Sequence, residues 1–172
     1  GVHTAYYLLH SINAGTQFDE VEAEMAKNFA DASSKCGVSQ IIYLGGIAND
    51  ENRSKHLASR MNTGVILGAG TVPVMELRAG IIIGSGSASF EMLRHLTHRL
   101  PVMTTPKWVS NRTQPIGIRD VLYYLRQCAL LPAPINQVFD IGGPQVLSYA
   151  DMMQKFAGLS GLRKSLIIQV PV

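Results

Sequence analysis

Strand-like and helix-like segments alternate along the whole chain, and this order constrains the fold more than any other feature of the sequence. Short, continuously apolar runs of strand length are separated by longer segments whose apolar residues recur every three or four positions. The expected strands are 4–10, 40–44, 73–83, 138–141 and 165–170. Continuously apolar strands that alternate with helices are typical of a parallel sheet covered on both faces. The sequence therefore predicts an α/β fold with a mostly parallel sheet and helices on both of its faces.

The helices expected between these strands carry apolar stripes at helical spacing. The first stripe, preceded by a capping box at Thr16 and Asp19, consists of Phe18, Val21, Met25, Phe29, Ala32 and Cys36. The second stripe is Leu57, Met61 and Val65. Further helices are expected over 89–100 and 118–131, and after Ser148, which is placed to cap the last of them. Residues 104–117 look irregular.

Composition and charge narrow the class of protein. The 172 residues, 47% hydrophobic and 16% charged, are enough for one globular domain, which we expect to span residues 1–172. The formal net charge of +3 is spread without a run of Lys or Arg, so we expect no nucleic-acid partner. Cys36 and Cys128 are too few and too isolated for a disulfide framework or a zinc site, which predicts a reduced, cytoplasmic protein.

The most apolar segment, residues 64–86, is a poor candidate for a membrane span. Glu76, Arg78 and several glycines interrupt it, and charged side chains are costly inside a bilayer. We therefore expect no membrane partner. The chain also begins almost directly in an apolar, strand-like run without a start methionine, which leads us to expect a fragment of a longer protein.

The carboxyl ends of the strands are the expected place for a ligand, because parallel sheets bind ligands there. This rule points to residues 10–15, 43–48 and 80–87. The sequence GSGSAS (84–89) has the spacing of a dinucleotide-binding glycine pair, but Ser89 stands at the third glycine position. We interpret it as a tight strand-to-helix turn in which Ser85, Ser87 or Ser89 caps the next helix, although its small residues could still contact a phosphate.

Three titratable residues share one face of the expected third helix, namely Glu91, His95 and His98. This spacing can hold a metal ion, but no third strong ligand is evident nearby, so we interpret the group as a solvated helix face and predict no metal site. The sequence contains neither the G-x-S-x-G motif of a nucleophilic serine nor the GxxxxGK[ST] loop of nucleotide triphosphatases.

His56 and Arg60 are the pair most compatible with proton-transfer chemistry. They lie four residues apart after the second strand, and positions i and i+4 share one face of a helix. Histidine titrates near neutral pH and can act as an acid or a base. Arginine stays charged and can hold a ribose or bias the neighbouring group, but it cannot shuttle a proton. The alternative interpretation is an ordinary polar helix face.

Five stretches in this order resemble a known family: AYYLLHS (5–11), IIYLGG (41–46), ELRAGIIIGSGSASFEMLR (76–94), PIGIRDV (115–121) and FDIGGPQVLSYADMM (139–153). The chain resembles the later part of an extended or atypical short-chain dehydrogenase/reductase, of the NAD(P)-binding or nucleoside-diphosphate-sugar epimerase-like group, and most resembles its NmrA- and YbjT-like branch. The resemblance implies a partial Rossmann fold with a small C-terminal substrate-side region. It implies that 5–11 is the fourth strand, and that the first three strands and the pyrophosphate loop lie upstream.

The resemblance also assigns roles to individual residues. It implies NAD or NADP as the cofactor, bound through His10, Ser11, Gly45, Gly46, Ala79, Gly80, Ile81 and Ile82. The catalytic serine or threonine of the family falls on Gly45 or Gly46, so that hydroxyl is absent. The tyrosine and lysine of the YxxxK pair align with His56 and Arg60, which we take as the candidate catalytic residues. Binding by this chain alone is expected to be poor, because most phosphate contacts would lie upstream.

Three functions stay open from the sequence. The first is an oxidoreductase that uses His56 in place of tyrosine, and the second is a sugar-nucleotide epimerase-like enzyme. The third is a non-catalytic dinucleotide sensor or assembly protein, which the loss of both hydroxyls favours. In each case the expected partners are a dinucleotide and an unknown small molecule. The sequence leaves the oligomeric state open, a homo-oligomer included.

Overall fold

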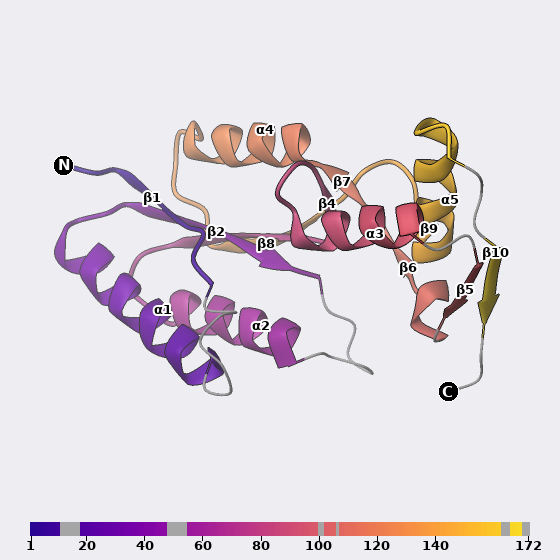
Figure 1. Cartoon of the computed structure of the whole chain (residues 1–172). Coiled ribbons are helices and arrows are strands. Elements are labelled where there is room, and N and C mark those ends of the chain that lie inside the picture. Colours follow the sequence, from indigo (N-terminus) through magenta and orange to yellow (C-terminus); the bar gives the residue numbers. More distant parts are fainter. Residues whose placement is uncertain (11–17, 48–54, 100–101, 106, 163–165, 170–172) are drawn as a thin grey trace. The chain divides into compact units, whose positions relative to one another are not determined.

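The computed structural model describes residues 1–10, 18–47, 55–99, 102–105, 107–162 and 166–169. These residues alternate between strands and helices along the chain, as predicted (Figure 1). The chain divides into two compact units. Unit 1 comprises Gly1–Ala79 and Leu122–Ile141, and unit 2 comprises Gly80–Val121 and Gly142–Val172.

Unit 1 is built on a four-stranded sheet with the order β1-β2-β3-β8. Its strands are β1 (Thr4–Tyr7), β2 (Gln40–Gly46), β3 (Val74–Ala79) and β8 (Gln137–Ile141). Every neighbouring pair is parallel, which confirms the predicted parallel sheet. Strand β2 lies inside the sheet and is buried over most of its length, which explains its continuous apolar run.

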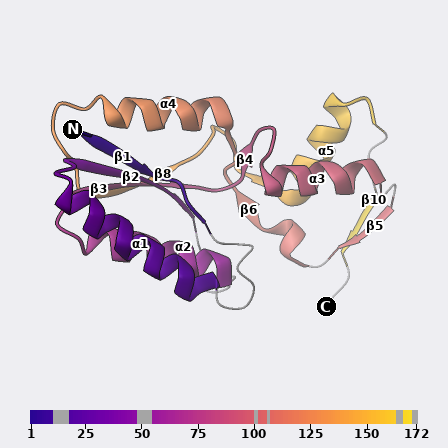
Figure 2. The ribbon, with the colours of Figure 1, turned by 60° about the vertical axis from the view of Figure 1, so that its left-hand side comes forward.

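Helices cover both faces of this sheet, as Figures 1 and 2 show. Helices α1 (Phe18–Lys35) and α2 (Lys55–Gly68) pack together on one face. The part of α4 (Ile118–Ala129) that belongs to unit 1 lies on the other face, where the Tyr6 hydroxyl donates to the Leu125 carbonyl over 3.1 Å. The core between α1, α2 and the sheet includes Tyr7, Ala26, Ala30, Ile41, Tyr43 and Leu67.

The two predicted apolar stripes describe the buried faces of α1 and α2 only in part. The buried residues of α1 are Phe18, Glu22, Ala26, Ala30 and Ser33, and those of α2 are Ser59, Thr63, Gly64 and Leu67. Val21 and Val65 are exposed instead. The reason is a buried polar contact between the helices, in which the Ser59 hydroxyl donates to the Glu22 carboxylate. Satisfied in this way, small polar residues can occupy the helix interface in place of larger apolar ones.

The predicted strand 73–83 divides into two strands. Strand β3 ends at Ala79, and β4 (Ile82–Ile83) pairs with β7 (Ile116–Gly117) in unit 2. The chain turns at Gly80, where a Cβ atom would lie 2.6 Å from the Thr113 hydroxyl. A side chain would therefore block the close approach that lets the Ile116 amide donate to the Ile81 carbonyl over 2.9 Å.

The described part of unit 2 contains three two-stranded sheets, the helices α3 and α5, and the start of α4. Strands β4 and β7 are parallel, as are β5 (Val102–Thr105) and β10 (Leu166–Gln169), whereas β6 (Arg112–Thr113) and β9 (Leu147–Ser148) are antiparallel. Helices α3 (Ala88–Arg99) and α5 (Tyr149–Leu159) pack together around Ile81, Leu93, Met152 and Met153. The segment predicted to be irregular thus holds β6, β7 and the short 3-10 helix η2 (Lys107–Ser110).

The glycine–serine segment before α3 is a turn, as predicted. Gly86 has a φ of 83°, a left-handed conformation that favours glycine. Ser87 is the capping residue of the three candidates, since its hydroxyl accepts from the Phe90 amide and its carbonyl accepts from the Glu91 amide. The turn and the cap that begin α3 therefore explain why this segment is rich in glycine and serine.

Helix α5 begins with the predicted cap, and its removal is expected to destabilise the protein. The Ser148 hydroxyl accepts from the Asp151 amide over 3.1 Å, and the Asp151 carboxylate accepts from the Ser148 amide over 2.9 Å. We expect Ser148→Ala to lower the free energy of unfolding by about 1 kcal/mol at neutral pH. Chemical denaturation followed by circular dichroism measures this change.

The same cap predicts a pH dependence. Hydrogen bonds from the Ser148 side chain and backbone lower the pKa of Asp151 from its ordinary value. The stabilisation is therefore present above the pKa of the unfolded state and is lost as the pH falls through the folded one. The loss caused by Ser148→Ala should accordingly be smaller at about pH 3 than at neutral pH. An equal loss at both pH values would show that the Asp151 carboxylate contributes nothing to the cap.

Candidate functional site

The carboxyl end of β2 holds the two glycines of the predicted site. Gly45 lies opposite Arg78 and Gly46 lies opposite Ala79 in the register of β2 and β3. A Cβ atom at Gly46 would lie 3.2 Å from Leu57 Cδ2 and 3.8 Å from Arg60 Cδ, so α2 packs closely against the end of the strand. The structure thus brings Gly45, Gly46, Ala79 and Arg60 together in unit 1.

Arg60 connects α2 to the end of β2 through two hydrogen bonds. Its guanidinium Nη2 donates to the Leu44 carbonyl over 2.9 Å, and its own carbonyl accepts from the Tyr43 hydroxyl over 2.8 Å. The guanidinium Nε is buried and has no hydrogen-bond partner among the described residues. The cation is therefore held at the strand end with unused donor capacity.

His56 lies in the first turn of α2 and is exposed. Its imidazole ring stacks on the ring of Phe18 at the start of α1, with centroids 4.5 Å apart and an interplanar angle of 28°. This contact holds one face of the ring and leaves the side chain accessible to solvent. An exposed, oriented imidazole is a chemically competent acid or base.

The remaining predicted cofactor residues lie in different parts of the molecule. His10 is exposed and follows β1, whereas Ser11 lies outside the described residues. Ala79 ends β3 in unit 1, while Gly80, Ile81 and Ile82 belong to unit 2. Within unit 2, Ile81 is buried and Ile82 is half-buried, and the Ile81 carbonyl is bonded to the Ile116 amide.

Glu76 of β3 is a buried carboxylate beside the carboxyl end of β2, and the sequence alone did not identify it as a site residue. It is only 4% exposed, and the Nε atom of Arg78 donates to its Oε1 over 2.8 Å. Glu76 and Arg78 alternate with apolar residues in VMELRA, which places both on one face of β3. Two charges at alternate positions of an apolar strand are the signal that could have identified this ion pair.

Tyr43 lies opposite Glu76 on β2 and belongs to the same polar group. Burial raises the pKa of its hydroxyl to about 12, with Arg60 opposing and Glu76 adding to the shift. The hydroxyl therefore stays protonated at neutral pH and acts as the donor to the Arg60 carbonyl. Tyr43 thus supports Arg60 and is not itself placed to exchange protons.

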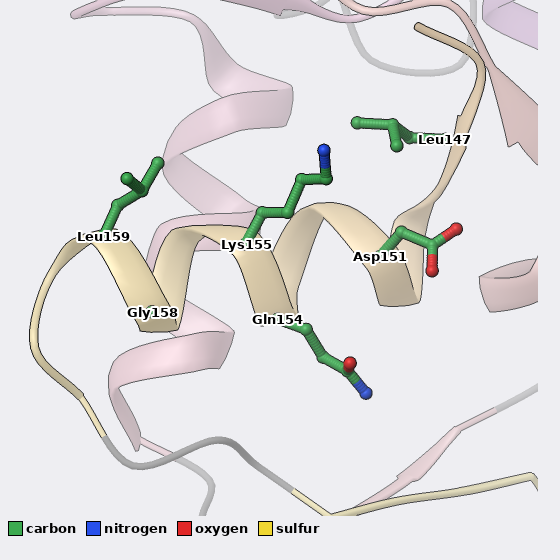
Figure 3. Close-up of a pocket in the computed structure, with 6 residues that line it drawn as sticks. All are labelled: Leu147, Asp151, Gln154, Lys155, Gly158 and Leu159. Atoms are coloured by element: carbon green, nitrogen blue, oxygen red, sulfur yellow. The ribbon is translucent and has the colours of Figure 1, made fainter.

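A depression of about 720 Å³ lies in unit 2, along one side of α5 (Figure 3). It is lined by Leu147, Asp151, Gln154, Lys155, Gly158 and Leu159. Its two charged groups are used locally, because Asp151 bonds to Ser148 and the Lys155 ammonium donates to the Gln145 side chain over 2.8 Å. It shares no residue with the predicted site.

The described residues offer neither a cluster of metal ligands nor a membrane-spanning helix. Within the described ranges, no group of three or more His, Cys, Asp and Glu side chains is arranged to hold a metal ion. Glu91 pairs with Arg94, and the ring of His98 contacts that of Phe156. None of the helices that the structure describes is both long enough and apolar enough to cross a membrane.

Solved structures with a similar fold include an NAD-dependent enzyme and enzymes in complex with NAD or NADP. The chain is similar to TunA, an NAD-dependent NDP-hexosamine 5,6-dehydratase involved in tunicamycin biosynthesis (17% identity, TM-score 0.72, 99% of this chain and 64% of that one). It is also similar to WbmG of Bordetella bronchiseptica in complex with NAD (14%, TM-score 0.76, 99% and 59%). A third is the UDP-glucose 4-epimerase of Thermotoga maritima with UDP-glucose (13%, TM-score 0.74, 98% and 64%). No protein-family model matches the sequence, and no curated protein matches it at a significant level.

These likenesses confirm the predicted fold class. The chain has a Rossmann-like α/β fold, with a parallel sheet flanked by helices. It spans between 59% and 64% of the length of these three proteins, while they match 98–99% of it.

Proposed function

We propose that this protein binds NAD or NADP as an atypical short-chain dehydrogenase/reductase, with His56 and Arg60 in place of the family's tyrosine and lysine. The observation that carries the proposal is the carboxyl end of β2, where Arg60 is bonded to the Leu44 carbonyl beside Gly46. In parallel α/β sheets this edge is where dinucleotides bind. The similarity to enzymes crystallised with NAD or NADP supports the same assignment.

The residues at this edge fit the nicotinamide end of a dinucleotide. Gly45 and Gly46 end the strand without side chains, and Arg60 holds its cation beside them through its bond to the Leu44 carbonyl. In this proposal His10 and Ala79 contact the cofactor from the ends of β1 and β3, and Arg60 orients the ribose. When bound, the nicotinamide would accept or supply a hydride.

His56 is then the residue that would move a proton. Its exposed imidazole can take a proton from a substrate hydroxyl, or return one to a carbonyl oxygen, as hydride transfer proceeds. Stacking on Phe18 restricts the ring and reduces the entropy lost on orienting it. Arg60 serves as an orienting cation and does not take part in proton transfer.

The substrate proposed first is a sugar nucleotide. Several similar structures are described as enzymes of such compounds, including a dTDP-glucose 4,6-dehydratase of Streptomyces venezuelae and MoeE5 in complex with UDP-glucuronic acid and NAD. Oxidoreduction at a sugar hydroxyl, and epimerisation through a transient ketone, both need one hydride carrier and one proton-transfer group. His56 would supply the second of these.

A second candidate function is non-catalytic dinucleotide binding, as in a sensor or an assembly protein. Two observations favour it: neither Gly45 nor Gly46 carries the hydroxyl of the family's active site, and the Arg60 guanidinium already bonds the Leu44 carbonyl. In that case His56 would be a surface residue stacked on Phe18.

The test uses the full-length protein and its His56→Ala variant. Binding of NADH and NADPH is measured by fluorescence, and turnover is measured with a panel of sugar-nucleotide and carbonyl substrates. We expect His56→Ala to lower kcat by about 10²-fold or more, while the dinucleotide Kd changes by less than about threefold. His95→Ala is the matched control, because His95 is an exposed histidine on α3.

The outcomes separate the two functions. Turnover that depends on His56 and not on His95 supports the oxidoreductase or epimerase-like function. Binding of a dinucleotide without turnover, unaffected by His56→Ala, supports the non-catalytic function. A protein that binds neither dinucleotide contradicts both.

A further inference from the structure

Glu76 occupies space that two glycines leave free. A Cβ atom at Gly45 on β2 would lie 2.7 Å from Oε1, and one at Gly64 on α2 would lie 2.5 Å from Oε2 and 2.9 Å from Cδ. The distances to the two oxygen atoms are shorter than a carbon–oxygen contact can be. Neither glycine position therefore tolerates a side chain while Glu76 stays where it is. The carboxylate therefore lies directly between the strand and the helix.

The surroundings of Glu76 explain how a charge can be retained there. The guanidinium of Arg78 bonds both carboxylate oxygens, at 2.8 Å and 3.4 Å. Tyr43 is its neighbour in the register of β2 and β3. A buried carboxylate costs several kcal/mol unless it is paired, and this pairing offsets that cost. An apolar side chain of the same size would fill the volume without requiring the cation.

The close approach at Gly64 continues into the part of α2 that carries the predicted site. Gly64, Arg60 and His56 lie at successive intervals of four residues, on one side of the helix. One turn before Gly64, Arg60 reaches the Leu44 carbonyl and accepts from the Tyr43 hydroxyl. These hydrogen bonds require α2 to lie at its present distance from β2.

We infer that Glu76 is a positioning residue, whose carboxylate sets the distance between α2 and β2 and thereby places Arg60 and His56 at the strand end. This inference rests on the proposed function for its consequence in dinucleotide binding. Its structural part, the dependence of Arg60 and His56 on Glu76, is measurable without any cofactor. The residues that make up this arrangement are Glu76 and Arg78 of β3, Gly45 of β2 and Gly64 of α2.

The first experiment is a size exchange between Gly64 and Glu76. In Gly64→Ala the added methyl group meets the carboxylate and moves α2, whereas Glu76→Asp shortens the acid by one methylene and makes room for it. We expect NMR signals of the His56 imidazole and the Arg60 guanidinium to shift in Gly64→Ala and to return in Gly64→Ala/Glu76→Asp. Gly68→Ala is the matched control on the same helix, since no atom lies within 4 Å of a Cβ atom there.

The second experiment measures dinucleotide affinity of the full-length variants under conditions in which each is fully folded. We expect Gly64→Ala to weaken binding about five- to tenfold, the equivalent of one lost hydrogen bond, and the double variant to recover to within about threefold of the unaltered protein. A general loss of stability would not be reversed by a second substitution that shortens a buried ion pair.

The two experiments separate the possible failures. If the unaltered protein binds no dinucleotide, the proposed function fails, and the NMR signals still decide the inference. If Gly64→Ala leaves both the signals and the affinity unchanged, or if the double variant does not restore them, the inference is overturned. Should Gly64→Ala not fold, a folded double variant with the original His56 signals supports the inference, and an unfolded one overturns it.

Discussion

Replacing Arg78 by methionine is expected to lower the free energy of unfolding by about 3 kcal/mol. The Glu76 side chain is 6% exposed, and Arg78 is its cation at 2.8 Å. Methionine keeps much of the volume of the arginine stem but leaves the carboxylate buried without a charge partner. Urea denaturation at neutral pH, followed by circular dichroism, gives the difference.

Two controls show whether the buried ion pair is the cause. Arg94→Met removes an ion pair with Glu91 whose side chains are 47% and 38% exposed, and we expect a loss below about 1 kcal/mol. The double variant Arg78→Met/Glu76→Met removes both charges of the pair and should recover most of the loss. Equal effects of Arg78→Met and Arg94→Met would show that burial contributes nothing to the Glu76 pair.

Gly143→Ala is expected to destabilise the protein by about 2–3 kcal/mol. A Cβ atom at this position would lie 2.4 Å from the carbonyl oxygen of Pro115, the same oxygen that accepts from the Gly143 amide over 3.0 Å. Because this neighbour is backbone, it cannot move aside as the end of a side chain can. Thermal unfolding followed by circular dichroism or calorimetry measures the shift in Tm.

Gly158→Ala provides the comparison for this prediction. Gly158 lies in α5, and no atom lies within 4 Å of a Cβ atom there. Alanine favours the helix over glycine, so this variant should be more stable by about 0.5–1 kcal/mol. If both variants raise the Tm, the close approach of Gly143 to the Pro115 carbonyl does not determine the effect of the substitution.

The strands were predictable because their signal is local. A continuous apolar run such as QIIYL is read directly from neighbouring residues, and β2 contains it. The stripes of α1 and α2 were not predictable in this way. Which face of each helix is buried depends on the hydrogen bond between Ser59 and Glu22, residues from separate helices. Hydrophobic spacing favoured Val21 and Val65, which the structure leaves exposed.

The candidate site shows the same division between local and distant signals. The spacing of His56 and Arg60 identified one helix face, and α2 indeed begins at Lys55. The Arg60 contact with the Leu44 carbonyl depends on how the chain returns from the end of β2, which spacing alone does not define. Glu76 carried a local signal, but the glycines that make room for it come from β2 and α2.

Unit 1 is discontinuous, and this has a consequence for the order in which the protein folds during synthesis. Its fourth strand, β8, pairs with β3 only after the whole of 80–121 has been made. Until then the Gln40 side chain lacks the Ile135 amide and carbonyl that it bonds in the finished sheet. A ribosome-bound chain that ends before residue 135 would thus expose one side of β3, and chaperones that bind open strand edges would compete with β8 for it.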